Sequence, residues 1–292
     1  MGILEGKAAV VTGGGRGIGR GHCIHLGREG AAVVVNDVDA AEAQKVAGEI
    51  EAAGGRAVAS ADDIGTRKGC EALVARCVSE FGRLDACVNN AGIVRDRTFL
   101  KMTDEEFDDV WRIHVKGTFW CAQAAANRMK EQGTGGAIVN TTSGAHMGNF
   151  GQTNYAAAKG AISSMTYTWA LELARFGIRV NAIGPRATTR MTGTIPGKDI
   201  PFIDPLLNGP IVAYLCSDEG NWVTGQVFNT GMDSVAVMHQ PRYGDAAFHE
   251  GGWTVEALRA HFKKAFTNRL EPFGLAKQPY PYYAGLEPGE GR

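Results

Sequence analysis

Residues 7–19 read Lys-Ala-Ala-Val-Val-Thr-Gly-Gly-Gly-Arg-Gly-Ile-Gly, a short apolar run that passes into a glycine-rich turn. The apolar run has the pattern of a buried strand, and a helix is expected to begin near Arg20. Glycines let the backbone approach a pyrophosphate, whose charge suits the amide groups at a helix N-terminus. The stretch therefore predicts a dinucleotide site. Its candidate contacts are Gly13, Arg16, Gly17, Ile18 and Gly19.

The next predicted strand, residues 32–37, ends on a carboxylate. Asp37 lies near the offset of about 20 residues from the glycine turn at which an acidic side chain receives the adenosine ribose hydroxyls. A carboxylate there repels a 2′-phosphate, so Asp37 favours NAD over NADP. Arg16 is the opposing signal, because its guanidinium could pair with that phosphate. Further along, Asp63 and Ile64 could meet the adenine.

Strand and helix patterns alternate along the rest of the chain. Further strands are expected at 57–60, 86–89, 137–143 and 179–183, and helices at 40–53, 68–81, 104–130 and 155–176. This alternation predicts an α/β protein with a Rossmann-type, doubly wound parallel sheet and helices on both faces. We expect residues 1–235 to form this single domain and residues 236–292 to form a C-terminal extension.

Residues 155–159 read Tyr-Ala-Ala-Ala-Lys and are predicted to lie on a helix, which places the phenol and the ammonium on one face. The pKa of a free tyrosine is about 10, too high for a base at neutral pH, and a nearby cation lowers it. Tyr155 could then exchange a proton with a substrate whose oxygen Ser143 holds. The same spacing also occurs on ordinary helix surfaces, so it gains weight only beside other motifs.

The overall composition narrows the class of protein. The 30 basic and 31 acidic residues give no basic excess, and no apolar run approaches the ~20 residues that span a bilayer, so neither nucleic acid nor a membrane is an expected partner. The N-terminus lacks a signal-peptide pattern. The six cysteines show no Cys-x-x-Cys spacing, so neither disulfides nor a metal site is indicated. We expect a cytoplasmic protein with a small-molecule substrate.

The motifs between about Gly6 and Asp233 together resemble the short-chain dehydrogenase/reductase family. They are T-G-G-G-R-G-I-G at 12–19, N-N-A-G at 89–92, the serine-bearing strand and Y-A-A-A-K at 155–159. The resemblance implies hydride transfer between a nicotinamide and a secondary alcohol or ketone. It implies catalytic roles for Ser143, Tyr155 and Lys159, with Lys159 also holding the nicotinamide ribose. It places further cofactor contacts at Asn90, Ala91, Gly92 and Pro185.

Within the family, the chain resembles the (3R)-hydroxyacyl-CoA dehydrogenase units of peroxisomal multifunctional enzymes and their stand-alone bacterial relatives. The segments that carry this likeness are V-V-V-N-D at 33–37, N-N-A-G-I-V-R-D-R-T-F at 89–99, G-N-F-G-Q-T-N-Y at 148–155 and T-R-M-T at 189–192. The likeness implies NAD as cofactor and a (3R)-3-hydroxyacyl-CoA as substrate. A hydroxysteroid or other bulky alcohol is the alternative substrate, and a non-catalytic dinucleotide sensor is the alternative of a different class.

Two positions depart from the family pattern. The usual serine position, counted back from Tyr155, is occupied by Thr142, whereas counting along the strand points to Ser143. We favour Ser143 and keep Thr142 as the alternative. His114 stands where most of the family has an asparagine that helps to hold a relay water. An imidazole can also hold water, so His114 is either a further catalytic residue or an ordinary buried histidine.

Two predicted helices carry apolar stripes, at Phe107–Phe119 and Met165–Phe176, that suggest subunit contacts. By resemblance we expect a homodimer or homotetramer. The segment 188–210 reads as a short substrate lid because it is rich in glycine and proline. A helix is expected to begin near Trp253, within an extension that covers either the substrate mouth or a partner subunit.

Overall fold

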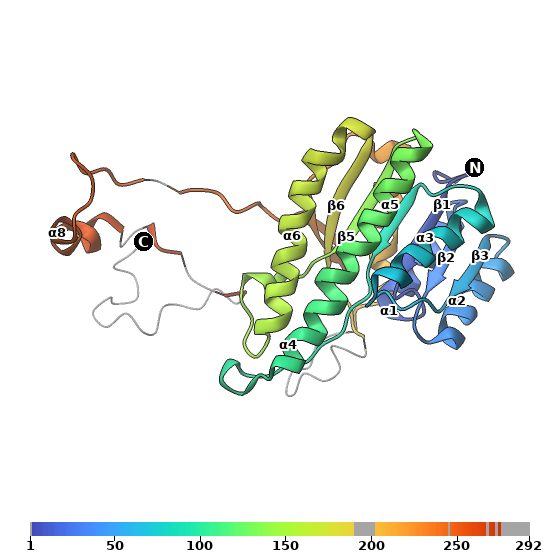
Figure 1. The fold of residues 1–292 in the computed structure, drawn as a ribbon, viewed down its shortest axis with the longest axis horizontal. Helices are drawn as coiled ribbons and strands as arrows, with labels where there is room; N and C mark the ends of the chain where they lie inside the picture. Colours follow the sequence, from blue (N-terminus) through green and yellow to red (C-terminus); the bar gives the residue numbers. More distant parts are fainter. Residues whose placement is uncertain (1, 190–201, 245, 267–268, 272–273, 276–292) are drawn as a thin grey trace.

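An eight-stranded sheet lies at the centre of the computed structural model, which describes residues 2–189, 202–244, 246–266, 269–271 and 274–275 (Figure 1). Its order is β3-β2-β1-β4-β5-β6-β7-β8. The strands are β1 (Ala8–Thr12), β2 (Ala32–Asn36), β3 (Arg56–Ser60), β4 (Ala86–Asn89), β5 (Gly136–Thr141), β6 (Ile178–Pro185), β7 (Val227–Gly231) and β8 (Ser234–Val237). Strands β1 to β7 pair in parallel, and β8 pairs antiparallel with β7. The predicted doubly wound sheet is confirmed.

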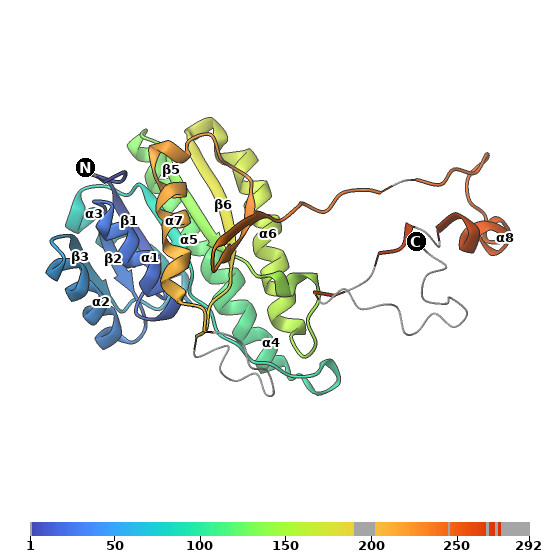
Figure 2. The ribbon, with the colours of Figure 1, turned by 180° about the vertical axis from the view of Figure 1, so that it is seen from behind.

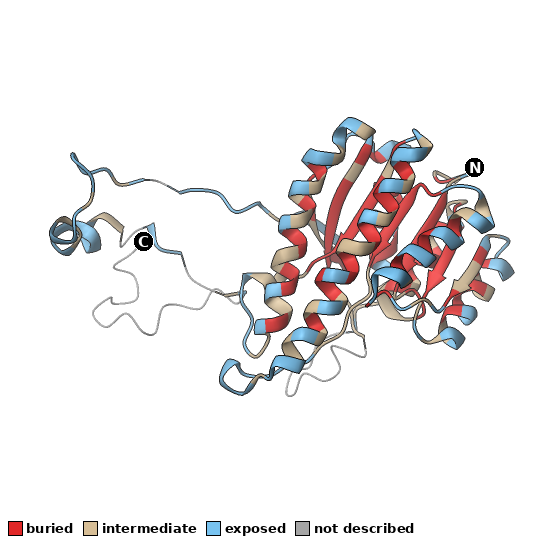
Figure 3. Ribbon diagram, in the orientation of Figure 1, coloured by how far each residue is buried: buried red, intermediate tan, exposed pale blue. Residues whose placement is uncertain are grey.

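Helices cover both faces of the sheet (Figures 1 and 2). They are α1 (Gly17–Arg28), α2 (Ala40–Ala52), α3 (Arg67–Phe81), α4 (Asp104–Trp111), α5 (Thr118–Gln132), α6 (Thr153–Leu173) and α7 (Gly209–Cys216), whereas α8 (Val255–Phe266) does not lie on the sheet. One core lies under α1, α2 and α7, and the other lies under α3, α5 and α6. Alternate strand residues serve the two cores: Val11 faces the first and Val10 the second. Figure 3 shows buried residues along the central strands, among them β1, β2 and β4.

The long helix expected at 104–130 is two α-helices joined by a π-helical segment, η2 (Arg112–Gly117). A helix pattern alone does not reveal such a bulge, because the apolar stripe continues through it. Close packing accompanies the bulge: a Cβ on Gly117 would lie 3.0 Å from the carbonyl oxygen of Ile64. The bulge carries His114 into the interior, where its side chain is buried.

The six cysteines are free and buried (Cys23, Cys70, Cys77, Cys87, Cys121 and Cys216). Beyond β8 the chain leaves the α/β body as an extended segment, and α8 lies apart from the body (Figures 1 and 2). The chain then returns, since the N–H of Leu275 donates to the carbonyl of Gly148 at 2.7 Å. Most of the predicted lid, 188–210, falls in 190–201 and lies outside the described residues. Within the described chain, no helix has the length and apolar character to cross a bilayer.

Helix α1 buries His22 completely, and neither ring nitrogen has a hydrogen-bond partner among the described residues. Burial lowers the pKa of His22 from 6.5 to about 3. The folded protein therefore takes up this proton less readily than the unfolded chain. The free energy of unfolding is therefore not reduced by His22 protonation above pH 6.5. As the pH falls from 6.5 towards 3, it decreases by up to about 1.4 kcal/mol per pH unit.

We expect His22→Leu to raise the melting temperature, and to raise it more at pH 5 than at pH 8, because leucine has no proton to accept and no unpaired polar atom. Thermal unfolding followed by circular dichroism at both pH values measures the difference. The exposed His239 provides the control variant, His239→Leu. An equal gain at the two pH values would contradict the proton-linked cost.

Candidate active site

The carboxyl ends of β1, β4, β5 and β6 meet at one edge of the sheet, and the motifs lie there. The chain order reverses between β1 and β4, which are neighbours in the sheet. In open α/β sheets this reversal leaves a crevice in which ligands bind. The glycine turn follows β1, N-N-A-G lies at the end of β4, Ser143 follows β5, and Pro185 ends β6. The fold thus brings together segments that are far apart in the sequence.

The glycine turn between β1 and α1 has the shape of an anion cradle. Gly13 and Gly17 have φ angles of 61° and 51°, which glycine adopts without strain. A Cβ on Gly19 would lie 2.0 Å from the carbonyl oxygen of Gly13, so the turn packs too closely for a side chain there. The N-cap residue of α1, Arg16, makes no side-chain capping hydrogen bond, so its side chain does not occupy the first amides, around Ile18. These features fit a dinucleotide pyrophosphate.

Asn90 braces the turn from behind. Its amide nitrogen donates to the carbonyls of Thr12 and Gly13 at 3.0 and 3.1 Å. The hydroxyl of Thr12 in turn accepts from the backbone N–H groups of Asn90 and Ala91, each at 3.0 Å. The side chain of Asn90 therefore ties β4 to the end of β1. Thr12, which the sequence interpretation did not single out, is the hub of this connection.

Two predicted adenosine contacts lie at the ends of β2 and β3. The Asp37 carboxylate accepts from the backbone N–H of Gly15 at 3.2 Å, which holds it against the glycine turn. The Asp63 carboxylate accepts from the N–H of Gly65 at 2.8 Å and so closes its own loop. Ile64, next to it, is buried. Of the two carboxylates, Asp37 is the one bonded to the turn.

Tyr155 and Lys159 project from one face of α6, beside the end of β5. Lys159 is only 2% exposed, and its ammonium donates to the carbonyl of Thr141 at 2.6 Å. Its Nζ lies 5.4 Å from the centre of the Tyr155 ring. Burial of the Lys159 ammonium lowers its pKa to about 7. Burial also raises the pKa of Tyr155, and a hydrogen bond from Ser143 acts in the opposite direction. Without a bound cation, then, the lowering influence on Tyr155 is Ser143 rather than Lys159.

The two candidate hydroxyls after β5 point in different directions. The Thr142 hydroxyl donates to the carbonyl of Lys159 at 2.8 Å and lies 2.8 Å from the hydroxyl of Ser163. It is buried against α6. Ser143 is half-exposed, its hydroxyl accepts from the backbone N–H of Ala145 at 3.2 Å, and its side chain acts to lower the pKa of Tyr155. Of the two hydroxyls, Ser143 is therefore the one that is accessible and that acts on Tyr155.

The geometry of the turn, the crevice and the tyrosine-lysine pair can be set beside known proteins. Residues 7–198 match the short chain dehydrogenase family. The chain belongs to this family. It is accordingly an oxidoreductase that acts on a CH–OH group of a small molecule with a nicotinamide dinucleotide. The cradle described above fits that cofactor.

Relatives of this short-chain dehydrogenase include a hydroxyacyl-CoA dehydrogenase and a peroxisomal multifunctional enzyme. It is 40% identical to the hydroxyacyl-CoA dehydrogenase ChsB1 of Mycobacterium tuberculosis over 287 residues, which cover 91% of this chain and 90% of that one. It is 34% identical to the peroxisomal multifunctional enzyme type 2 of Mus musculus over 92% of this chain and 38% of that longer protein. The expected likeness to this branch of the family is confirmed.

Solved structures agree with the fold of this short-chain dehydrogenase. A short-chain dehydrogenase from Mycobacterium avium matches 96% of this chain and 98% of its own with a TM-score of 0.84 and 37% identity. A 7α-hydroxysteroid dehydrogenase, solved with NADH and 7-oxo glycochenodeoxycholic acid, matches 77% of this chain and 93% of its own with a TM-score of 0.72 and 33% identity.

His114 lies beside Tyr155, the candidate acid/base of this dehydrogenase. Its ring meets the Tyr155 ring edge to face, with centroids 5.3 Å apart. Its Nε2 lies 2.8 Å from the carbonyl oxygen and 3.0 Å from the amide nitrogen of Ile93, while the buried Nδ1 has no partner among the described residues. Burial lowers the pKa of His114 to about 3, so the ring is neutral at physiological pH. A Cβ on Gly92 would lie 2.3 Å from this ring, which explains a glycine there.

Asn154, directly before Tyr155, is a positioning residue that the sequence interpretation missed. Its amide donates to the carbonyls of Arg95 and Glu106 at 2.9 and 3.0 Å, and its oxygen accepts from the N–H of Tyr155 at 2.7 Å. It thereby fixes the start of α6 to the loop after β4 and to α4. The only signal in the sequence was its place beside the tyrosine.

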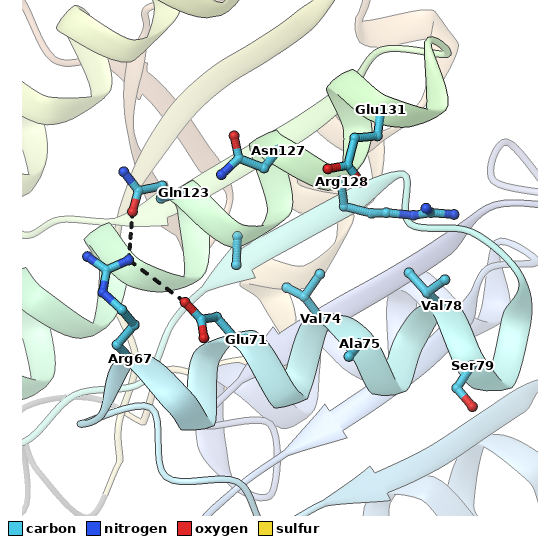
Figure 4. A pocket seen from close by; sticks show the side chains of 11 residues that line it. Arg67, Glu71, Val74, Ala75, Val78, Ser79, Gln123, Asn127, Arg128 and Glu131 are labelled. Atoms are coloured by element: carbon cyan, nitrogen blue, oxygen red, sulfur yellow. Dashed lines mark hydrogen bonds and ion pairs between the residues drawn. The ribbon is translucent and has the colours of Figure 1, made fainter.

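A groove of about 540 Å³ lies elsewhere, between α3 and α5 (Figure 4). At one end Arg67 contacts Gln123 at 2.7 Å and Glu71 at 4.0 Å. None of the candidate catalytic or cofactor residues lines it. The groove is therefore separate from the crevice at the strand ends.

Proposed function

We propose that this short-chain dehydrogenase uses NAD to oxidise the C3 alcohol of a (3R)-3-hydroxyacyl-CoA, or reduces the corresponding ketone. The observation that carries the proposal is the 40% identity to a hydroxyacyl-CoA dehydrogenase over nine tenths of both chains. The arrangement of Ser143, Tyr155 and Lys159 at the crevice supplies the groups such a reaction needs.

In this proposal Ser143 holds the substrate oxygen and Tyr155 exchanges its proton. Bound NAD would supply the carbon that accepts the hydride, and its positive charge would favour the phenolate form of Tyr155. Lys159, anchored by Thr141, would hold the nicotinamide ribose. General acid/base work of this kind contributes about 10²–10⁴-fold.

His114 completes the proposed proton path as a neutral imidazole. The hydrogen-bond distances to both the amide and the carbonyl of Ile93 allow Nε2 to be acceptor or donor, so Nδ1 can take the complementary role toward a water. A low pKa suits this task, because the ring passes hydrogen bonds without becoming charged next to Lys159. In this respect the histidine would replace the amide that most of the family has.

NAD is the proposed cofactor because the Asp37 carboxylate sits against the glycine turn, where it would repel a 2′-phosphate. The roles of Asp63, Ile64, Asn90, Ala91, Gly92 and Pro185 at the cofactor belong to the same proposal. We also propose a cytoplasmic homodimer or homotetramer. The extended residues before α8 and the exposed Phe248 and Phe262 support a C-terminal extension, 236–292, that packs beside the substrate mouth or on a partner subunit.

A bulky secondary alcohol such as a hydroxysteroid is the second candidate substrate. The likeness to the 7α-hydroxysteroid dehydrogenase supports it, at 33% identity over 77% of this chain. The two candidates share the fold and the proposed catalytic residues, so only turnover separates them.

Initial rates on a matched panel test the proposal. The panel holds both C3 epimers of 3-hydroxyacyl-CoA thioesters of several chain lengths beside steroid alcohols, each with NAD and with NADP. We expect kcat/KM for (3R)-thioesters with NAD to exceed that for steroids at least tenfold. Turnover confined to steroids would contradict the proposed substrate but not the proposed alcohol oxidation. NAD binding without turnover on any alcohol would instead support a non-catalytic dinucleotide sensor.

A further inference from the structure

The guanidinium of Arg16, in the glycine turn, is held by the start of α2. Its Nη2 lies 2.5 Å from Oδ2 of Asp39 and 3.4 Å from Oε1 of Glu42. Asp39 is the N-cap of α2, where its other oxygen accepts from the backbone N–H of Glu42 at 3.4 Å. The helix start therefore fixes both carboxylates, and they in turn orient the arginine.

Because Arg16 lies in the glycine turn, its contacts affect which dinucleotide can bind. An arginine near the adenosine ribose can accommodate the 2′-phosphate of NADP. In this structure the arginine instead faces two carboxylates of its own chain, and Asp37 adds a third beside the turn. One cation among three carboxylates leaves a negative local charge, which opposes a phosphate that carries nearly two negative charges.

We infer that Asp39 and Glu42 are specificity-determining residues that exclude NADP by engaging Arg16. The inference rests on the dinucleotide site proposed above and extends cofactor selection beyond Asp37. The side chains of Arg16 and Asp39 are about 40% exposed, so the pair lies at the surface, where a bound dinucleotide can reach it. Neutral side chains at 39 and 42 should therefore free the guanidinium for the 2′-phosphate.

The test is the double variant Asp39→Asn/Glu42→Gln, in which asparagine keeps a good N-cap for α2. Dissociation constants for NAD and NADP, measured by calorimetry without substrate, give a readout independent of turnover. We expect the NADP constant to fall at least tenfold and the NAD constant to stay within twofold. An unchanged NADP constant would overturn the inference.

Two further variants isolate the role of the arginine. Adding Arg16→Gln to the double variant should abolish the gain in NADP affinity; a gain that survives would mean that lost repulsion, and not Arg16, is responsible. Glu49→Gln is the matched control, because Glu49 pairs with Arg20 at 2.6 Å across α1 and α2, outside the glycine turn. An equal gain in the control would also overturn the inference.

The same measurements separate this inference from the proposed function. Unmodified protein that binds NAD, with no NADP gain in the double variant, would overturn the inference alone. Unmodified protein that binds neither dinucleotide would overturn the proposed cofactor as well.

Discussion

Tyr155→Phe should lower turnover at least a hundredfold and leave NAD binding nearly unchanged. The variant removes the hydroxyl that exchanges the substrate proton and keeps the ring, whose edge contact with His114 at 5.3 Å helps to hold its position. Loss of one general acid/base typically costs about 10²–10⁴-fold. Because the interaction is made in the transition state, kcat and kcat/KM should fall together.

Steady-state rates and NAD titration by calorimetry measure the two effects separately. Tyr167→Phe is the matched control, since Tyr167 lies on the same helix, α6, and loses the same atom. Near-normal turnover in Tyr155→Phe would exclude the proposed mechanism. A loss of NAD affinity as large as the loss of rate would show instead that the phenol serves binding.

Lys159→Met should weaken NAD binding at least tenfold, lower turnover about a hundredfold, and stabilise the fold. The buried ammonium has one described hydrogen bond, to Thr141, and burial lowers its pKa from 10.5 to about 7. The folded protein thus binds this proton less readily than the unfolded chain. The cost grows as the pH falls from 10.5 to 7 and then stays constant, at an upper bound of a few kcal/mol.

Methionine keeps the length of the side chain without the charge, so its gain in melting temperature should be larger at pH 7 than at pH 10. Thermal unfolding at the two pH values, beside NAD calorimetry, tests this combination. The exposed Lys116 provides the control, Lys116→Met. A destabilised variant at pH 7 would show that the Thr141 bond outweighs the cost of burial. A less active but more stable variant is the expected pattern where a buried charge is retained for function at a cost in stability.

The sequence predicted the parts of the molecule that depend on local patterns. β1, the glycine turn and the tyrosine-lysine spacing on α6 follow from apolar runs, glycine and helical periodicity, and the structure has them. β8 was not predicted, because its four residues are all exposed and carry no alternation. Counting residues could not decide whether Thr142 or Ser143 is the candidate substrate ligand. The choice depends on which hydroxyl is buried against α6, and that is Thr142.

Side-chain partners across elements were the second limit of prediction. Asp37 and Arg16 gave opposing signals about the cofactor, and the contacts of Arg16 with Asp39 and Glu42 come from the packing of α2 beside the turn. The buried orientation of His114 depends on a π-bulge that the apolar stripe concealed. Such features require the relative placement of elements, which residue spacing does not supply.

The pairing of β1 with β4 also determines when the crevice can form during folding. The hydrogen bond between Ala8 and Asp85 joins residues that are 77 positions apart in the sequence. The residues that pair β1 with β2, such as Ala8 and Ala32, are much closer in the sequence. Closing a loop of that length comes at a larger entropic cost than closing a short one. The cradle is complete only when Asn90 reaches Thr12 and Gly13. During refolding, dinucleotide affinity should therefore recover only when β4, which carries Asn90, has packed beside β1.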